Sequence, residues 1–113
     1  MISVAHFNSA EPDFGERAQL ALTTLAARPG YLHGSLARST DEDDAGADHW
    51  VIVTEWESVG AYRRALGAFE VKLHATPLLG EAIDLPSGFE VLVDVDHDGR
   101  LRLHTSDRAE GER

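Results

Sequence analysis

The chain has 113 residues, no cysteine and a formal net charge of −10, from twenty acidic and ten basic side chains. Without cysteine, neither disulfides nor thiolate metal sites nor a thiol nucleophile can contribute to the fold or the chemistry. The negative charge argues against nucleic acid and membranes as partners, because anionic surfaces would be repelled. The N-terminus lacks a basic signal-peptide start and no apolar run approaches the roughly 20 residues that span a bilayer, so we expect one cytoplasmic domain.

The first half of the chain predicts a strand, a helix and a second strand. Residues 2–9 alternate in hydropathy with a period of two, which is typical of a strand. Apolar positions then recur at spacings of three and four, as on one stripe of a helix that ends at Arg28, Pro29 and Gly30. These positions are Phe14, Ala18, Ala21, Leu22 and Leu25. Residues 31–39 indicate the second strand, and the acidic run 41–48 indicates a solvated hairpin loop.

The second half begins with the strongest strand signal, residues 50–56, whose apolar side chains in both phases suggest that both faces are covered. Ser58 can cap a second helix, followed by a short helical piece within residues 71–79. The apolar stripe of this second helix comprises Tyr62, Ala65, Leu66 and Phe69. Residues 89–96 alternate as a fourth strand, and a short extra strand at residues 101–103 follows a turn. We expect residues 106–113 to be disordered.

This order of elements, βαββαβ, predicts an α+β fold of ferredoxin-like topology, with a four-stranded antiparallel sheet and helices on one face. We assign residues 1–97 to this domain and residues 98–113 to a C-terminal extension. Four apolar side chains, Phe7, Val51, Val53 and Leu92, are expected on the uncovered face. Such a patch favours a homodimer. Because Ser3, Glu55 and Glu90 share that phase, a monomer with a half-polar exposed face is the alternative.

Three stretches carry a resemblance to a known family: residues 28–32, residues 51–58 with Ala61 and Tyr62, and His74. Together they resemble the antibiotic biosynthesis monooxygenase domain over residues 2 to 95. The resemblance implies a dimer in which two sheets meet face to face as an α+β barrel, with a pocket in each subunit between helices and sheet. It also implies either cofactor-independent oxygenation of polyketide anthrones and quinols, or oxidative opening of haem.

The haem-degrading branch of this family uses an Asn on the first strand, a Trp in the second helix and a His as the iron ligand. Asn8 and His74 match the first and last of these positions, and Ala65 stands where the Trp should be. Because that Trp shapes a distorted haem, its replacement argues against haem cleavage. We therefore expect a protein without a cofactor or metal, and haem bound through His74 is the alternative.

The resemblance implies a pocket formed by Asn8 and His6 from the first strand and by Tyr62 and His74 from the helices. In this hypothesis Asn8 and His74 are catalytic, with Asn8 binding a substrate oxygen and a His taking the proton, while His6, Tyr62 and Trp56 bind substrate. Simpler interpretations exist: His74 can be a surface histidine, Asn8 a turn residue, and Tyr62 and Trp56 core aromatics, as Trp50 is.

We therefore predict a cofactor-independent monooxygenase of an aromatic or polyketide-like small molecule, a quinol or anthrone. The alternatives are a haem-binding or haem-degrading monooxygenase, and a non-catalytic dimeric ligand-binding or stress protein on the same scaffold. Residues 94–99 also match the opening of a calcium-binding loop. Because the twelfth position is Thr105 where such a loop needs Glu, a hairpin turn is favoured there.

Overall fold

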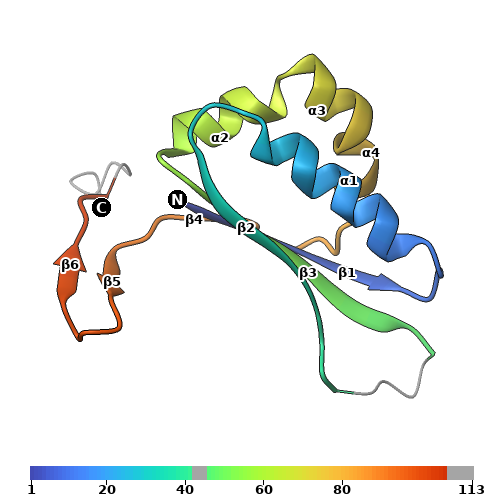
Figure 1. Cartoon of the computed structure of the whole chain (residues 1–113), viewed down its shortest axis with the longest axis horizontal. Helices are drawn as coiled ribbons and strands as arrows, with labels where there is room; N and C mark the ends of the chain where they lie inside the picture. Colours follow the sequence, from blue (N-terminus) through green and yellow to red (C-terminus); the bar gives the residue numbers. More distant parts are fainter. Residues whose placement is uncertain (42–45, 107–113) are drawn as a thin grey trace.

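The computed structural model describes residues 1–41 and 46–106, and it contains one four-stranded antiparallel sheet with the helices on one face (Figure 1). The strands of this sheet lie in the order β2-β3-β1-β4. Their bounds are β1 Ile2–Ser9, β2 Tyr31–Arg38, β3 Asp48–Trp56 and β4 Gly88–Phe89. The helices are α1 Phe14–Ala26, α2 Val59–Leu66, α3 Phe69–His74 and α4 Thr76–Leu79. The α+β class and the sheet topology predicted from the sequence are confirmed.

The sheet packs against the helices through alternate side chains of its two central strands. Ser3, Ala5 and Phe7 of β1 are buried, as are Ile52, Thr54 and Trp56 of β3. On the helix side they meet the apolar stripe of α1, which is Phe14, Ala18, Ala21 and Leu25. The predicted stripe is therefore confirmed apart from Leu22, which is only partly buried. Aromatic rings pack between the sheet and α1: the ring centroid of Phe14 lies 5.3 Å from the ring centroids of both Phe7 and Trp50.

The second helical region starts where the sequence predicts and is broken into three short helices. The Ser58 hydroxyl accepts a hydrogen bond from the Ala61 N–H at 3.0 Å, which is the expected cap of α2. Gly67 ends α2, and Pro77 lies in the first turn of α4. None of the described helices has the length and hydropathy needed to cross a membrane.

The opposite face of the sheet, which we call the open face, differs from the expectation at two positions of β1. By alternation it carries Ile2, Val4, His6 and Asn8 of β1, His49, Val51, Val53 and Glu55 of β3, and His33, Ser35 and Ala37 of β2. Phe7 is not among them, because its ring is 1% exposed beneath α1. The strand phase assigned to Phe7 was therefore wrong, as was the placing of Ser3 on this face.

The predicted fourth strand is divided between two sheets. Only Gly88–Phe89 pairs with β1, whereas β5, Val93–Val95, pairs with β6, Leu101–Leu103, in a separate hairpin. A turn after β5 reverses the chain and so separates this hairpin from the four-stranded sheet. In the turn, an Asp96 carboxylate oxygen accepts hydrogen bonds from the N–H groups of Asp98 and Arg100, each at 2.9 Å. The hairpin interpretation of residues 94–99 is confirmed, and Leu92 lies outside the four-stranded sheet.

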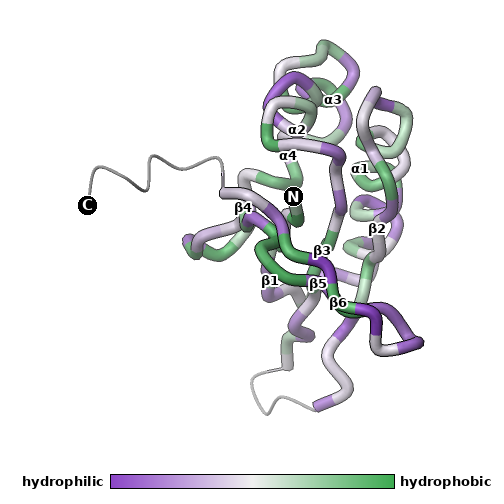
Figure 2. Tube along the Cα trace, turned by 90° about the vertical axis from the view of Figure 1, so that its left-hand side faces the viewer, coloured by the Kyte–Doolittle hydropathy of each residue, from purple (hydrophilic) through white to green (hydrophobic). Residues whose placement is uncertain are grey.

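The β5–β6 hairpin projects away from the rest of the molecule (Figure 1) and has two different faces. One face carries two cross-strand apolar pairs, Val93 with Leu103 and Val95 with Leu101, all more than half exposed. Figure 2 shows these apolar stretches on both strands. On the other face Asp94 pairs with Arg102 and accepts a hydrogen bond from His104, which lowers the pKa of Asp94. Most of the predicted disordered tail, residues 107–113, lies outside the described residues, as do residues 42–45 of the predicted acidic loop.

Gly30 fixes the turn from α1 into β2 against the start of α2. Its φ is +88°, and a Cβ placed there would lie 2.5 Å from the Ala61 Cβ. We expect Gly30→Ala to lower the free energy of unfolding by about 2 to 4 kcal/mol, since it combines a left-handed backbone with a clash. Gly99→Ala is the matched control, because Gly99 has a φ of +80° with nothing within 4 Å. It should show only the cost of the left-handed backbone, about 1 to 2 kcal/mol, in urea unfolding, and equal costs for the two variants would contradict the clash.

Candidate active site

A cavity lies beside the edge of β1, under α2, α3 and α4. Its volume is about 850 Å³, which is within the usual range for a small-molecule site. The far wall is the segment 82–87, which is tied to β1 at both ends: the Ile83 N–H donates to the His6 carbonyl and the Val4 N–H donates to the Ser87 carbonyl, each at 2.7 Å. Between these two hydrogen bonds the segment bulges away from β1 and leaves room for a ligand.

The cavity wall is mainly apolar, with a small number of polar side chains. The apolar part includes Leu66, Leu79, Ala82, Ile83 and Leu85. The polar side chains are Ser3, Tyr62, Lys72, Thr76, Asp84 and Ser87. An apolar wall with a few polar groups that fix orientation is typical of sites for small organic molecules.

A pair of hydroxyl groups lies in this wall. Ser3 is 6% exposed, and its hydroxyl donates a hydrogen bond to the Tyr62 oxygen at 3.1 Å. Because the Tyr62 oxygen already accepts this bond, its own proton is free to be donated to a ligand in the cavity. The ring of Tyr62 is held from behind by Trp56, with centroids 5.6 Å apart. Tyr62 thus offers one oriented donor on a rigid support.

Trp56 supports the site and does not line the cavity. It is 1% exposed, its indole N–H donates to the Thr54 hydroxyl at 2.7 Å, and Tyr31 packs edge-on against its other side. Burial raises the pKa of the Tyr31 phenol, which is also absent from the cavity wall. The core interpretation of Trp56 therefore agrees with its position, and direct contact with substrate does not.

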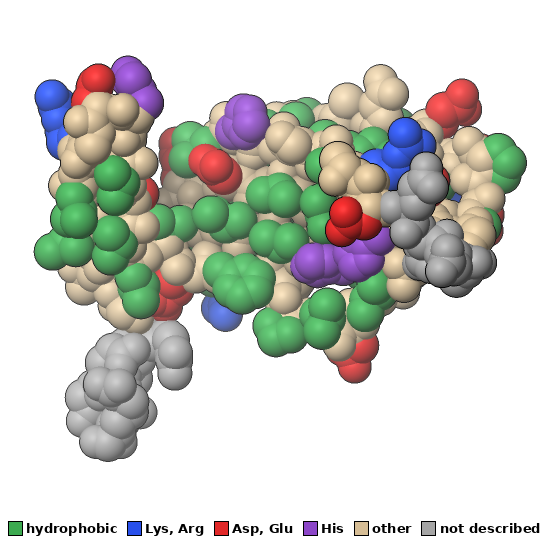
Figure 3. Space-filling model, turned by 90° about the horizontal axis from the view of Figure 1, so that it is seen from below, with side chains coloured by type: hydrophobic (Ala, Val, Ile, Leu, Met, Phe, Trp, Pro, Cys, Tyr) green, Lys and Arg blue, Asp and Glu red, His purple; other side chains and the backbone are tan. Residues whose placement is uncertain are grey.

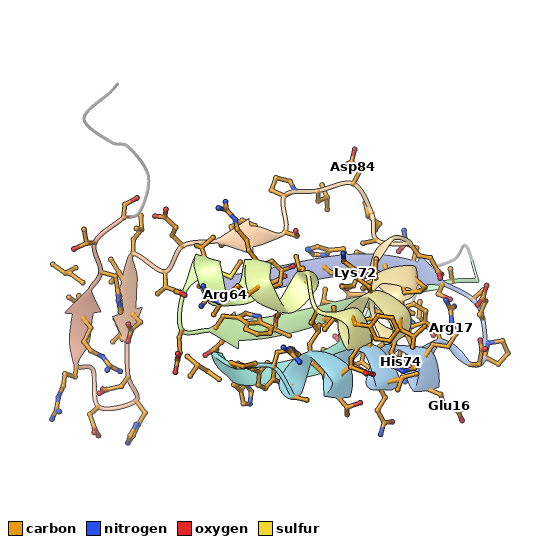
Figure 4. All side chains as sticks on the ribbon, turned by 90° about the horizontal axis from the view of Figure 1, so that it is seen from above. Glu16, Arg17, Arg64, Lys72, His74 and Asp84 are labelled. Atoms are coloured by element: carbon orange, nitrogen blue, oxygen red, sulfur yellow. The ribbon has the colours of Figure 1, made fainter. Side chains whose placement is uncertain are left out.

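The other site residues predicted from the sequence are not brought together. His6 and Asn8 lie on the open face, on the other side of the sheet from Tyr62. The side chain of His74 is 41% exposed and lies near Glu70 of the same helix, with 3.7 Å between Nε2 and the carboxylate. Figure 4 shows His74 and Lys72 on different sides of α3. The structure does not bring Asn8, His6, Tyr62 and His74 into one pocket, because strand alternation separates the first two from the helices.

His6 has a partner that the sequence pattern did not reveal. Its Nδ1 lies 3.0 Å from Nε2 of His49, and the two rings meet edge to face. His49 is directly opposite Asn8 in the β1–β3 register, so the three polar side chains form a group at one end of the open face. In the part of the chain that the structure describes, no cluster of three or more His, Asp or Glu side chains could hold a metal ion.

The residues present do not fit a haem site of the kind that the resemblance suggests. Such a site needs the His74 imidazole and the Asn8 amide on the same porphyrin, and the sheet lies between these two residues. We expect haem titration to give no Soret shift that depends on His74, so that wild type and His74→Ala have the same spectrum. A shifted Soret band lost in His74→Ala, followed by bilin formation with reductant and oxygen, would contradict this expectation.

Comparison with known proteins agrees with this architecture. No curated protein matches the chain. SnoaB from Streptomyces nogalater, described as a cofactor-independent oxygenase, is 21% identical over 96% of this chain and 92% of its own, with a TM-score of 0.59. A conserved protein from Methanosarcina mazei Go1 is 18% identical over 77% of this chain and 84% of its own, with a TM-score of 0.52. These similarities concern the fold.

The family model described as antibiotic biosynthesis monooxygenase matches residues 1–74, which include β1, α1, β2, β3, α2 and α3. The matched region covers well over half of the chain. The protein therefore belongs to the antibiotic biosynthesis monooxygenase family.

Proposed function

We propose that the protein is a cofactor-independent monooxygenase that oxidises an aromatic or polyketide-like small molecule, a quinol or anthrone, in the cavity beside Tyr62. The observation that carries this proposal is the apolar cavity of about 850 Å³ with the Ser3–Tyr62 hydroxyl pair in its wall. The family and the similarity to SnoaB support a monooxygenase-type activity. The polar groups that line the cavity favour an enzyme over a non-catalytic binding protein.

The proposed oxidation requires few functional groups from the protein. An ionised anthrone can give an electron to oxygen, and conversion of its CH₂ group to a carbonyl supplies the four electrons that reduce oxygen. One oxygen atom enters the product and the other leaves as water, so no external reductant is needed. The cavity must then hold the ring and donate a hydrogen bond to the oxygen that carries negative charge. The apolar wall can hold the ring, and the Tyr62 hydroxyl can donate that hydrogen bond.

Tyr62→Phe tests this role directly. We expect oxygen uptake with dithranol, a dihydroxyanthrone, to fall by roughly 10- to 100-fold in kcat, because one oriented donor to the developing anion is lost. Tyr31→Phe is the matched control: it removes a phenol hydroxyl from the other neighbour of Trp56, outside the cavity. It should keep the wild-type rate.

Two results would count against the proposal. An unchanged rate in Tyr62→Phe would remove Tyr62 from the mechanism. Saturable binding of dithranol without oxygen uptake above the buffer rate would support a ligand-binding protein instead. Thermal unfolding of both variants should accompany the assay, since Tyr62→Phe also leaves the buried Ser3 hydroxyl without its acceptor, at a cost of about 1 kcal/mol or more.

We also propose that the protein works as a homodimer joined through the open face. Val4, Val51 and Val53 are half-buried at its centre, and Val4 is paired directly with Val53. Figure 3, which views this face, shows apolar side chains gathered over the sheet and over the hairpin at its side. Two apolar surfaces on the same side of the molecule favour a second copy as the cover, because apolar patches of this extent are uncommon on monomers.

Val53→Asp should split this dimer, because association would bury a carboxylate without a partner. Light scattering at micromolar concentration should give the dimer mass for wild type and the monomer mass for the variant. Leu20→Asp is the control, since Leu20 is an apolar residue 51% exposed on α1, in the helix layer. It should leave the mass unchanged, whereas a monomer mass for the wild-type protein would overturn the dimer.

A further inference from the structure

Lys72 is the only lysine of the chain, and its position on α3 places it in the wall of the cavity. Within residues 1–41 and 46–106, its ammonium group has no ion pair and no hydrogen bond. Other basic side chains of the described residues, such as Arg63 and Arg64, also lack an ion pair, but Lys72 is the only Lys or Arg that lines this cavity. Arg17, for comparison, pairs with both Glu11 and Glu81.

The acidic side chains nearest in sequence do not neutralise Lys72. Glu70, on the same helix, lies beside His74, and Glu81, after α4, pairs with Arg17. Asp84 lines the cavity from the opposite wall, yet it forms no ion pair with Lys72. Figure 4 shows Asp84 pointing outward at the edge of the molecule, away from α3. The positive charge of Lys72 is therefore available to a molecule inside the cavity.

We propose that Lys72 makes the cavity selective for an aromatic carboxylate, with the carboxylate on the ammonium group and the ring system against the apolar wall. This inference rests on the proposed function and narrows its substrate class. Tyr62 donates to a ring oxygen and Lys72 binds the acid group, so the two residues fix the orientation of the substrate. In a chain with a net charge of −10, a local cation also offsets the repulsion that an anionic substrate meets elsewhere on the surface.

The test uses two fluorescent probes that share one ring system: anthracene-carboxylate, an anion, and anthracenemethanol, its neutral alcohol. Wild type should bind the carboxylate more tightly than the alcohol, and this preference should weaken with added salt. Lys72→Met should lower the preference by about five- to tenfold, and Lys72→Arg should restore most of it. Because Lys72 is exposed, these variants should fold, which circular dichroism can verify.

Arg64→Met is the matched control, since it changes the net charge by the same amount from a residue of α2 that does not line the cavity. It should keep the wild-type preference, which would rule out a general charge effect. If wild type and Lys72→Met show the same preference for the carboxylate over the alcohol, the carboxylate inference is wrong while the proposed oxygenase function stands. If neither probe binds wild type, the cavity is not the substrate site and both proposals fail.

Discussion

The burial of Trp56 is the interaction on which the rest of the structure depends. Its backbone N–H and carbonyl both bond to Met1, at 2.8 and 3.1 Å, so the last residue of β3 holds the start of β1. Its ring lies between Tyr31 of β2 and Tyr62 of α2. One residue thus joins two neighbouring strands and the helix that covers them. The phenol of Tyr62 reaches the cavity because this ring fills the space behind it.

The fold was predictable where a segment has a strong local signal. α1 follows from its apolar spacing, β3 from its apolar run and Ser58 from its capping chemistry. β1 was ambiguous, since both of its phases contain apolar residues: Ile2 and Val4 in one, Ala5 and Phe7 in the other. Only the contact between the Phe7 and Phe14 rings decides which phase is buried. The end of the sheet was missed for a different reason, because a hairpin and a fourth strand show the same alternation.

The candidate site was predictable only in part. Tyr62 follows from the stripe of α2, whereas the motif positions of Asn8 and His74 carried no information about the face on which each side chain lies. Ser3, Lys72 and Thr76 were missed because the segment 82–87, which turns this edge of β1 into a cavity wall, has no periodic pattern. The one available signal was compositional, a single lysine in an acidic chain.

Because the side chains of β1 alternate between the two faces of the sheet, this strand contributes to both the cavity and the open face. Ser3 points to the helices and bonds to Tyr62, while its neighbour Val4 points to the open face opposite Val53. The proposed substrate site and the proposed dimer surface therefore lie on opposite sides of the sheet, so a second copy on the open face need not block the cavity. Their connection is the backbone of β1 itself, which the Val4 N–H ties to Ser87 in the cavity wall. A shift of β1 on association would move Ser3, and with it the hydrogen bond that orients the Tyr62 hydroxyl.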